Sequence, residues 1–303
     1  MPPPKLPDPT TDAGRAGLAA LLAEPGAALL GLDFDGTLAP IVPDPDAARG
    51  HPDVPRVLTR LAAAGIRVAV VTGRPAATAV EYAGIADVPG LVVLGHYGLE
   101  RWEGGTVTAP EDLSAVDEAR RRLPDVLAAA GAPDGTYVED KGAAVAVHTR
   151  RTADPPATFD ALRDPLTELA GQVGLVVEPG RFVHELRPAG GDKGDALRTL
   201  ARQAISARTP LKVVVYVGDD LGDLAAFDAV DRFRAEGTPG LLVCSGSTEV
   251  TVLADRADIV VDGPDGVVTL LGTLADALTI SGPVDSGPSA LPTPGRGRKD
   301  LRP

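Results

Sequence analysis

The stretch Ala27-Ala28-Leu29-Leu30-Gly31-Leu32-Asp33-Phe34-Asp35-Gly36-Thr37-Leu38 is an apolar run that ends in two carboxylates followed by Gly and Thr. Such a run predicts a strand buried on both faces, and strands of this kind belong mostly to parallel sheets covered by helices. The carboxyl end of the strand is the expected place for chemistry, and Asp33 and Asp35 point the same way if the strand continues through them. Two acids beside the backbone N–H groups of a turn at Gly36 suit Mg²⁺ and a phosphoryl group, although an acidic pair is also typical of a solvated turn.

The composition is that of a folded, acidic protein. The chain has 303 residues, of which 44% are hydrophobic and 23% charged, enough for two domains. The formal net charge of −13 argues against nucleic acid as a partner, because a nucleic-acid interface needs a basic face. Cys244 is the single cysteine, and no uninterrupted apolar run approaches the ~18 residues of a membrane-spanning helix. We therefore expect a cytoplasmic monomer without disulfides and without membrane or nucleic-acid partners.

Strand-like and helix-like segments alternate in two parts of the chain and predict a doubly wound α/β core. In the first part the apolar run is followed by a helix after residue 52, a strand over 66–71, a helix over 76–83 and a strand over 91–94. In the second part come a helix over 193–207, a strand over 211–217, a helix over 221–229 and strands near Leu241 and Ile259. We expect the core to occupy 13–105 and 188–280.

Between these parts the pattern changes to long helices and hairpins. Helical spacing covers 111–130 and 155–173, and paired strands are expected over 136–138 with 143–149 and over 175–178 with 182–186. Residues 106–187 are therefore expected to form an inserted α+β cap. The Pro-rich segments 1–12 and 281–303 are expected to be disordered tails.

The sequence Asp33-Phe34-Asp35-Gly36-Thr37-Leu38 resembles the first motif of the haloacid dehalogenase superfamily. In that superfamily the first Asp attacks phosphorus and the second acts as general acid and base, which implies these roles for Asp33 and Asp35. The other motifs follow in order at predicted strand or helix ends: Thr72 after the second strand, and Lys193 at the start of a helix. Thr72 and Lys193 would hold the phosphate, since phosphoryl transfer needs donors and positive charge around the equatorial oxygens.

The fourth motif is Gly-Asp-Asp-Leu-Gly-Asp over 218–223, and it indicates a metal. Its three acids would repel one another unless a cation lay among them. We assign Mg²⁺ to Asp33, the backbone of Asp35, and Asp219, with Asp220 and Asp223 ordering its water shell. Taken separately, each motif has a plainer interpretation as a turn, a surface lysine or a capping cluster.

A finer resemblance, to trehalose-6-phosphate phosphatases, covers the chain from about Ala27 to Leu278. The segments 139–141 and 147–150 are similar to the family's Glu-x-Lys and His-x-Arg pattern, and 180–188 resembles its Gly-Lys-x-x-x-Glu-x-Arg-Pro. The resemblance implies a Rossmann-like core with a cap of the C2B type. It also implies a set of residues that contact the substrate: Glu139, Lys141, Arg181 and Glu185. Arg74 is a further candidate for substrate binding. For the hairpin charges the alternative is that they are solvated or pair with each other, and Arg74 could instead hold the first loop.

Several positions depart from the family pattern. Arg181 stands where Lys is commoner, 95–98 is Gly-His-Tyr-Gly where Gly-x-His-Gly is usual, and Gly222 and Leu224 stand where Thr and Glu are frequent. His51 and His184 are expected to lie away from the site.

The implied activity is Mg²⁺-dependent hydrolysis of trehalose 6-phosphate through an aspartyl-phosphate on Asp33, a step of trehalose biosynthesis. The alternatives are a phosphatase for sucrose 6-phosphate or another phosphosugar, a phosphomutase, and a non-catalytic sugar-phosphate sensor. A sensor is expected to have lost Asp33 or Asp35, and both are present.

Overall fold

The computed structural model describes residues 5–42, 44–180, 182–206, 211–246 and 251–280. Its larger part is built on an eight-stranded sheet with the order β12-β11-β10-β1-β2-β3-β4-β5. The strands from β12 to β3 are parallel, whereas β4 and β5 run antiparallel to their neighbours. In chain order the strands are β1 (Ala28–Leu32), β2 (Arg67–Val71), β3 (Val92–Gly95), β4 (Glu100–Glu103), β5 (Thr106–Thr108), β10 (Val213–Gly218), β11 (Gly240–Gly246) and β12 (Ile259–Asp262).

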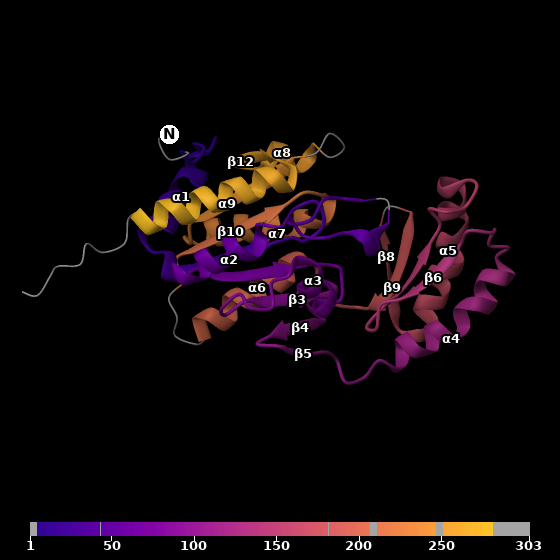
Figure 1. Cartoon of the computed structure of the whole chain (residues 1–303). Helices are drawn as coiled ribbons and strands as arrows, with labels where there is room; N and C mark the ends of the chain where they lie inside the picture. The colour runs from indigo at the N-terminus through magenta and orange to yellow at the C-terminus, as the bar shows by residue number, and fades with distance from the viewer. Residues whose placement is uncertain (1–4, 43, 181, 207–210, 247–250, 281–303) are drawn as a thin grey trace, which may run out of the picture.

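Helices cover both faces of this sheet, as the doubly wound pattern predicts (Figure 1). Alternate strand residues face opposite sides, so that Leu30 and Val215 contribute to one apolar core and Leu29 and Val214 to the other. The first core is closed by α1 (Asp12–Ala23), α2 (Val54–Ala63), α3 (Ala76–Ala83) and α9 (Gly263–Ile280). The second core is closed by α6 (Lys193–Ser206), α7 (Leu224–Ala235) and α8 (Val252–Arg256).

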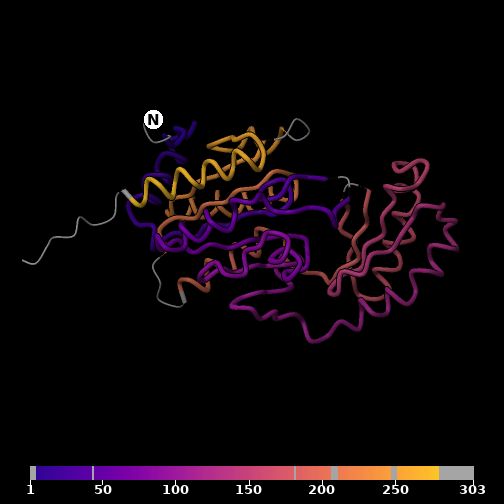
Figure 2. Tube along the Cα trace, in the orientation of Figure 1, coloured from indigo at the N-terminus to yellow at the C-terminus, as the bar shows by residue number. Residues whose placement is uncertain are grey.

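The cap is a separate four-stranded antiparallel sheet with the order β6-β7-β9-β8. Its strands are β6 (Tyr137–Asp140), β7 (Val145–His148), β8 (Leu175–Gly180) and β9 (Val183–Pro188). The helices α4 (Ser114–Ala129) and α5 (Pro155–Val173) cover one face through an apolar core of their own. The register places Glu139, Ala146, Glu185 and Glu178 in one row across the sheet, on the face opposite the helices. Figures 1 and 2 show the chain crossing between core and cap after β5 and again after β9.

The expected start of the cap at residue 106 differs from the structure. The strands β4 and β5 form a hairpin that extends the large sheet, so the cap segment begins after Thr108. The turn is Gly104-Gly105, and both glycines have positive φ (56° and 85°), as a two-residue hairpin turn requires. A Gly-Gly pair between two short strand-like segments was therefore the signal for this hairpin.

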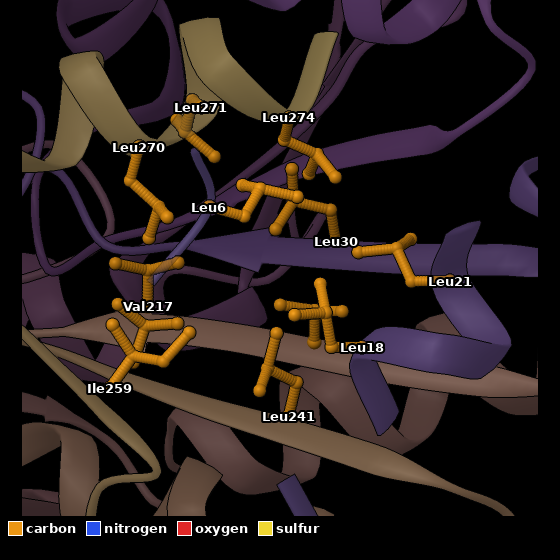
Figure 3. Close-up of a pocket in the computed structure, with 12 residues that line it drawn as sticks. Leu6, Leu18, Leu21, Leu30, Val217, Leu241, Ile259, Leu270, Leu271 and Leu274 are labelled. Carbon is orange, nitrogen blue, oxygen red and sulfur yellow. The ribbon is translucent and has the colours of Figure 1, made fainter. Parts of the chain in front are cut away.

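The expectation of a disordered tail over 1–12 is wrong for residues 5–12. The N–H of Thr10 donates to the backbone oxygen of Asp258 (2.8 Å), and the Thr11 side chain caps α1 by accepting from Gly14 N–H. Leu6 lines a small apolar cavity of about 20 Å³ beneath α1 and α9, together with Leu274 and ten other residues (Figure 3). Proline richness alone does not separate a free tail from a segment that packs on the core. Residues 1–4 and 281–303 lie outside the described residues.

Four 3₁₀ turns complete the described part of the chain. They are η1 (Pro25–Ala27), η2 (Pro45–Ala47), η3 (His96–Gly98) and η4 (Leu221–Asp223). Two of them border the site described below: η3 directly follows β3, and η4 begins three residues after the end of β10. Among the helices that the structure describes, none combines the length and the apolar character needed to cross a membrane.

Candidate active site

The site lies where the strand order of the large sheet reverses. Along the chain, β1 is followed by β2 and β3 on one side, while β10, β11 and β12 continue on the other side. The crevice at such a switch point is where open α/β sheets bind ligands. Asp33 follows β1, Asp219 follows β10, and the N–H of Asp33 donates to the backbone oxygen of Val217 (2.9 Å), so the two strand ends are held side by side.

A buried ion cluster occupies this crevice. The Lys193 ammonium lies 2.8 Å from Oδ1 of Asp33 and 2.8 Å from Oδ1 of Asp223, and all three side chains are almost inaccessible to solvent. Asp223 also accepts from the Tyr216 hydroxyl (2.7 Å) and from the backbone N–H of Asp219 (3.0 Å). Burial lowers the pKa of Lys193, but Asp223 and Asp33 outweigh it and hold that pKa well above the usual range. The lysine is therefore a permanent cation between two acids.

The cluster holds more carboxylates than lysines, and the pKa values of Asp33 and Asp219 are raised. Burial raises the pKa of Asp33 well above its usual range, with Asp223 and Asp219 adding to the rise and Lys193 opposing it. Burial, helped by Asp223 and Asp220, raises the pKa of Asp219 to about 7. A further cation in the crevice would restore the ionised form of these carboxylates.

Three of the acids meet the requirements of a divalent metal. Asp33, Asp219 and Asp223 each offer a carboxylate oxygen, and these oxygens lie within 4.8 Å of one another. Oδ1 of Asp219 is buried and makes no hydrogen bond to any described residue. An all-oxygen donor set with an unpartnered carboxylate oxygen suits a hard cation. Asp220 lies outside this set, since its side chain caps η4 by accepting from Gly222 N–H (2.8 Å).

Gly36 is the glycine that the metal site requires. Its φ is +76°, a conformation that side chains rarely adopt, and a Cβ at this position would overlap the Asp219 carboxylate. The Ser245 hydroxyl donates to the Gly36 backbone oxygen (2.6 Å), which ties this turn to the end of β11.

Asp33 and Asp35 have different partners, and the condition set for a shared direction, a strand that continues through both residues, is not met. The strand β1 ends at Leu32, before either acid, so strand alternation no longer applies to them. Both oxygens of Asp35 accept from the Arg74 guanidinium, from Nε and from Nη2, each at 2.7 Å. Arg74 is mostly buried, and its guanidinium also lies over the Phe34 ring. The Arg74 guanidinium thus contacts the first loop at Asp35 and Phe34.

Thr72 follows β2 and is 1% exposed. Its hydroxyl accepts from Arg74 N–H (3.1 Å), and its backbone oxygen accepts from Tyr97 N–H (3.0 Å). The loop after β2 is thus fastened to η3, which follows β3. Thr72 lies at the carboxyl end of β2 and Lys193 is the first residue of α6, the positions that the sequence predicts for them.

The cap contributes a second set of charges. Nζ of Lys141 lies 2.7 Å from Oε2 of Glu185, and Oε2 of Glu139 is hydrogen bonded to Nε2 of His148 (2.6 Å). Lys141 also meets the core, because its backbone oxygen lies 2.9 Å from Nε2 of the buried His96. Oε1 of Glu185 is buried and makes no hydrogen bond to any described residue. In this state the hairpin charges pair with each other, as the alternative interpretation held. Arg181 lies outside the described residues.

Several residues of the site were missed by sequence reasoning. His96 and Tyr97 follow β3, a strand end to which no role was given, although the same reasoning about strand ends applied to it. Arg187 lies over the Tyr97 ring at 4.9 Å and pairs with Glu178 (3.0 Å), where the cap joins the core. The expectation for the other two histidines is confirmed: Nδ1 of His51 accepts from Asp53 N–H, and His184 stacks on Phe159 inside the cap.

Comparison with known proteins gives a consistent picture. A family model described as trehalose-phosphatase matches residues 31–258, which span both the core motifs and the cap. The trehalose-phosphate phosphatase of Mycobacterium avium (strain 104) is 36% identical over 269 residues, covering 81% of this chain and 61% of that protein. The chain therefore spans about three fifths of the length of this curated relative.

Two solved structures are similar in fold. The C-terminal domain of Candida albicans trehalose-6-phosphate phosphatase superposes with a TM-score of 0.67 at 22% identity, covering 90% of this chain and 99% of that one. Crystal form 3 of the Aspergillus fumigatus trehalose-6-phosphate phosphatase gives 0.62 at 24% identity, covering 89% and 100%. At these identities the likeness concerns the fold, a Rossmann-like core of the haloacid dehalogenase type with a cap.

Proposed function

The chain belongs to the trehalose-phosphatase family, and from that premise we propose that it hydrolyses trehalose 6-phosphate to trehalose and phosphate. The observation that carries the proposal is the buried cluster of Asp33, Lys193, Asp219 and Asp223 at the switch point of the sheet. Such a cluster supplies a nucleophile, a fixed cation and a set of metal ligands in one crevice. These are the parts that transfer of a phosphoryl group to a carboxylate needs.

Asp33 is proposed as the nucleophile. One of its carboxylate oxygens attacks phosphorus, the bond from phosphorus to the sugar oxygen breaks, and an aspartyl-phosphate forms. Water then attacks this phosphorus, which releases inorganic phosphate and restores the Asp33 carboxylate. Lys193 holds Asp33 in place and stabilises the charge on the phosphoryl oxygens, and the Thr72 hydroxyl is a further phosphate ligand.

Asp35 is proposed as the group that protonates the leaving sugar oxygen and later accepts a proton from the attacking water. Both its oxygens accept from Arg74 in the structure, so Asp35 has to exchange this contact for the substrate before it can donate a proton. We accordingly assign Arg74 to positioning Asp35 rather than to binding the sugar.

Mg²⁺ is the proposed cofactor, with Asp33, the backbone of Asp35, and Asp219 as ligands and Asp220 and Asp223 around them. When bound, it would neutralise part of the phosphoryl charge and keep Asp33 ionised. The proposal is supported by the oxygen-only donor set and by the unpartnered Asp219 oxygen.

Selectivity for the sugar is proposed to come from the cap face that carries Glu139, Lys141 and Glu185, with Arg181 as a further candidate. These side chains are carboxylates and cations that can bond sugar hydroxyls. Oε1 of Glu185 is buried and makes no hydrogen bond to any described residue, with Nδ1 of His96 4.0 Å away. Buried groups that lose a hydroxyl partner are left unsatisfied, which costs roughly 1 to 3 kcal/mol per contact.

The test of the proposed function is phosphate release from a panel of phosphosugars, with Mg²⁺ or with EDTA. We expect trehalose 6-phosphate to have the highest kcat/KM in the panel and EDTA to abolish its turnover. A higher kcat/KM for sucrose 6-phosphate or glucose 6-phosphate would reject the proposed substrate, and activity that survives EDTA would reject the metal.

The test of the cap uses Glu185→Gln and Glu139→Gln. Each is expected to lower kcat/KM for trehalose 6-phosphate by roughly tenfold to a hundredfold, while 4-nitrophenyl phosphate stays within about threefold. Glu111→Gln, at an exposed position on the segment that leads into α4, is the matched control. Equal losses for both substrates would show that these residues are structural.

A cytoplasmic, monomeric protein without a nucleic-acid partner is part of the same proposal. The net charge of −13 supports the part that concerns nucleic acid, because a nucleic-acid interface needs a basic face. Size-exclusion chromatography with light scattering and cell fractionation test it, and a dimer or a membrane-bound fraction would contradict it.

A further inference from the structure

Tyr97 occupies a strained turn at the edge of the candidate site. His96 and Tyr97 both have left-handed backbones, with φ of 47° and 58°, and Gly98 follows with φ of 103°. Two consecutive non-glycine residues in this region are uncommon, and such strain persists where the surrounding structure enforces it, often at functional sites. Here the enforcement is visible: His96 N–H donates to Arg74 O (3.1 Å) and Tyr97 N–H donates to Thr72 O (3.0 Å).

The turn directs the Tyr97 side chain back over the loop that carries Thr72. A Cβ at Gly73 would lie 2.6 Å from the Tyr97 hydroxyl oxygen, so the phenol approaches this loop as closely as a glycine permits. The Arg187 guanidinium covers the ring from the cap side at 4.9 Å. The ring is therefore fixed on two sides, by the loop after β2 and by the cap.

The hydroxyl itself has no assigned task. It makes no hydrogen bond with any residue that the structure describes, although charged groups surround it. Burial raises the pKa of Tyr97, and Glu185, Lys193 and Asp33 are the charges that act on it most, with Lys193 opposing the rise. The phenol is therefore a neutral donor beside the loop that carries Thr72, close enough to Asp33 and Lys193 for their charges to act on it.

We propose that the Tyr97 hydroxyl is a phosphate-binding group that donates a hydrogen bond to a non-bridging oxygen of the substrate's phosphoryl group. This inference rests on the proposed phosphatase function. It adds a residue to the site that neither the motif reasoning nor the family resemblance included.

The phosphoryl oxygens are the partner that this position favours over the sugar hydroxyls. The hydroxyl lies against Gly73, the neighbour of Thr72, and the Thr72 hydroxyl is the other neutral donor assigned to the phosphate. Lys193, the cation of the site, is already shared between Asp33 and Asp223 at 2.8 Å each. A phosphate dianion has three non-bridging oxygens, so an additional fixed donor at this loop fits its charge.

The test compares Tyr97→Phe with the wild-type chain in two measurements. Calorimetric titration of the Mg²⁺-loaded protein with orthophosphate should show affinity reduced about tenfold or more, since a hydrogen bond to a charged partner is lost. Values of kcat/KM for trehalose 6-phosphate and for 4-nitrophenyl phosphate should fall together, by about tenfold to a hundredfold. The melting temperature should stay unchanged, because the hydroxyl bonds no described residue.

Tyr82→Phe is the matched control. It also removes a phenol hydroxyl and keeps the ring that stacks on Arg49 and Arg74, and its phosphate affinity should equal that of the wild type. Unchanged orthophosphate affinity in Tyr97→Phe would overturn the proposal, and so would a loss confined to trehalose 6-phosphate, which would place the contact on the sugar. If the wild type prefers another phosphosugar, the proposed substrate fails while the orthophosphate titration still decides the role of Tyr97.

Discussion

Asp219→Asn should stabilise the metal-free protein at pH 8 while removing its ability to hold the metal. In the fold Asp219 is 4% exposed and lies among Asp33, Asp220 and Asp223 with a single lysine nearby. Ionisation of the Asp219 carboxylate in this buried cluster is unfavourable unless a metal cation is bound. Asparagine has nearly the same size as aspartate but carries no charge. The substitution therefore distinguishes two effects of the Asp219 carboxylate: it destabilises the metal-free fold, and it binds the metal.

The magnitude follows from the pKa of Asp219, which burial and the neighbouring acids raise from 3.8 to about 7. Between about pH 4 and pH 7 the folded protein holds a proton on Asp219 that the unfolded chain has lost. Stability of the metal-free protein therefore falls as pH rises through this window, and the loss is complete above pH 7. At 1.36 kcal/mol per pH unit the loss is about 4 kcal/mol, or roughly 10 °C in melting temperature.

The assay is thermal unfolding in EDTA at pH 5 and at pH 8, repeated with Mg²⁺. We expect the wild type to lose stability from pH 5 to pH 8 in EDTA and to regain it with Mg²⁺. Asp219→Asn should lose much less in EDTA and gain little from Mg²⁺, with metal affinity reduced by at least about tenfold to a hundredfold. Asp87→Asn, an exposed aspartate on the loop after α3, is the control and should behave as wild type. If Asp219→Asn is less stable than wild type in EDTA at pH 8, the reasoning is refuted.

Three further predictions follow from the same site. Asp33→Asn should reduce phosphate release by more than about a thousandfold without lowering the melting temperature, and residual activity within about tenfold of wild type would contradict its role as nucleophile. Gly36→Ala should push the Asp219 carboxylate aside and impose a left-handed backbone on alanine, costing about 1–3 kcal/mol and weakening Mg²⁺ binding in a calorimetric titration; unchanged affinity would show that the turn adapts. Small-angle scattering should show compaction when Mg²⁺ and a non-hydrolysable phosphosugar analogue are added, because the cap has to exclude water from the aspartyl-phosphate; an identical profile at saturation would count against closure.

Much of the core could be predicted because its signals are local. The apolar run before Asp33 and the strands over 67–71 and 213–218 are continuous buried segments, and parallel strands place their carboxyl ends at one edge. For this reason Asp33, Thr72, Lys193 and the Asp219 cluster were expected together before any contact was known. Helix ends were equally local, as with Gly65, whose φ of +95° lies just beyond the end of α2.

The sequence pattern did not predict the placement of segments whose structure depends on the elements packed against them. Leu6 in the Pro-rich segment 5–12 and Trp102 in the short strand β4 bury their side chains only because α1, α9 and the edge of the sheet lie beside them. Amino-acid composition shows how polar a segment is. It does not show whether a surface of the folded protein lies next to that segment for it to pack against.

The sequence by itself determined which chemical groups gather at the switch point, because strand order and strand ends follow from hydrophobic pattern and connection rules. Only the tertiary structure decided which of these groups touch. It paired Asp35 with Arg74, Lys141 with Glu185, and the Tyr97 phenol with the loop of Thr72. Each of these contacts joins residues 24 or more positions apart, and their geometry depends on where a strand stops and how a loop twists. A one-residue change in the end of β1 turns Asp35 toward a different partner, and periodicity cannot specify that end.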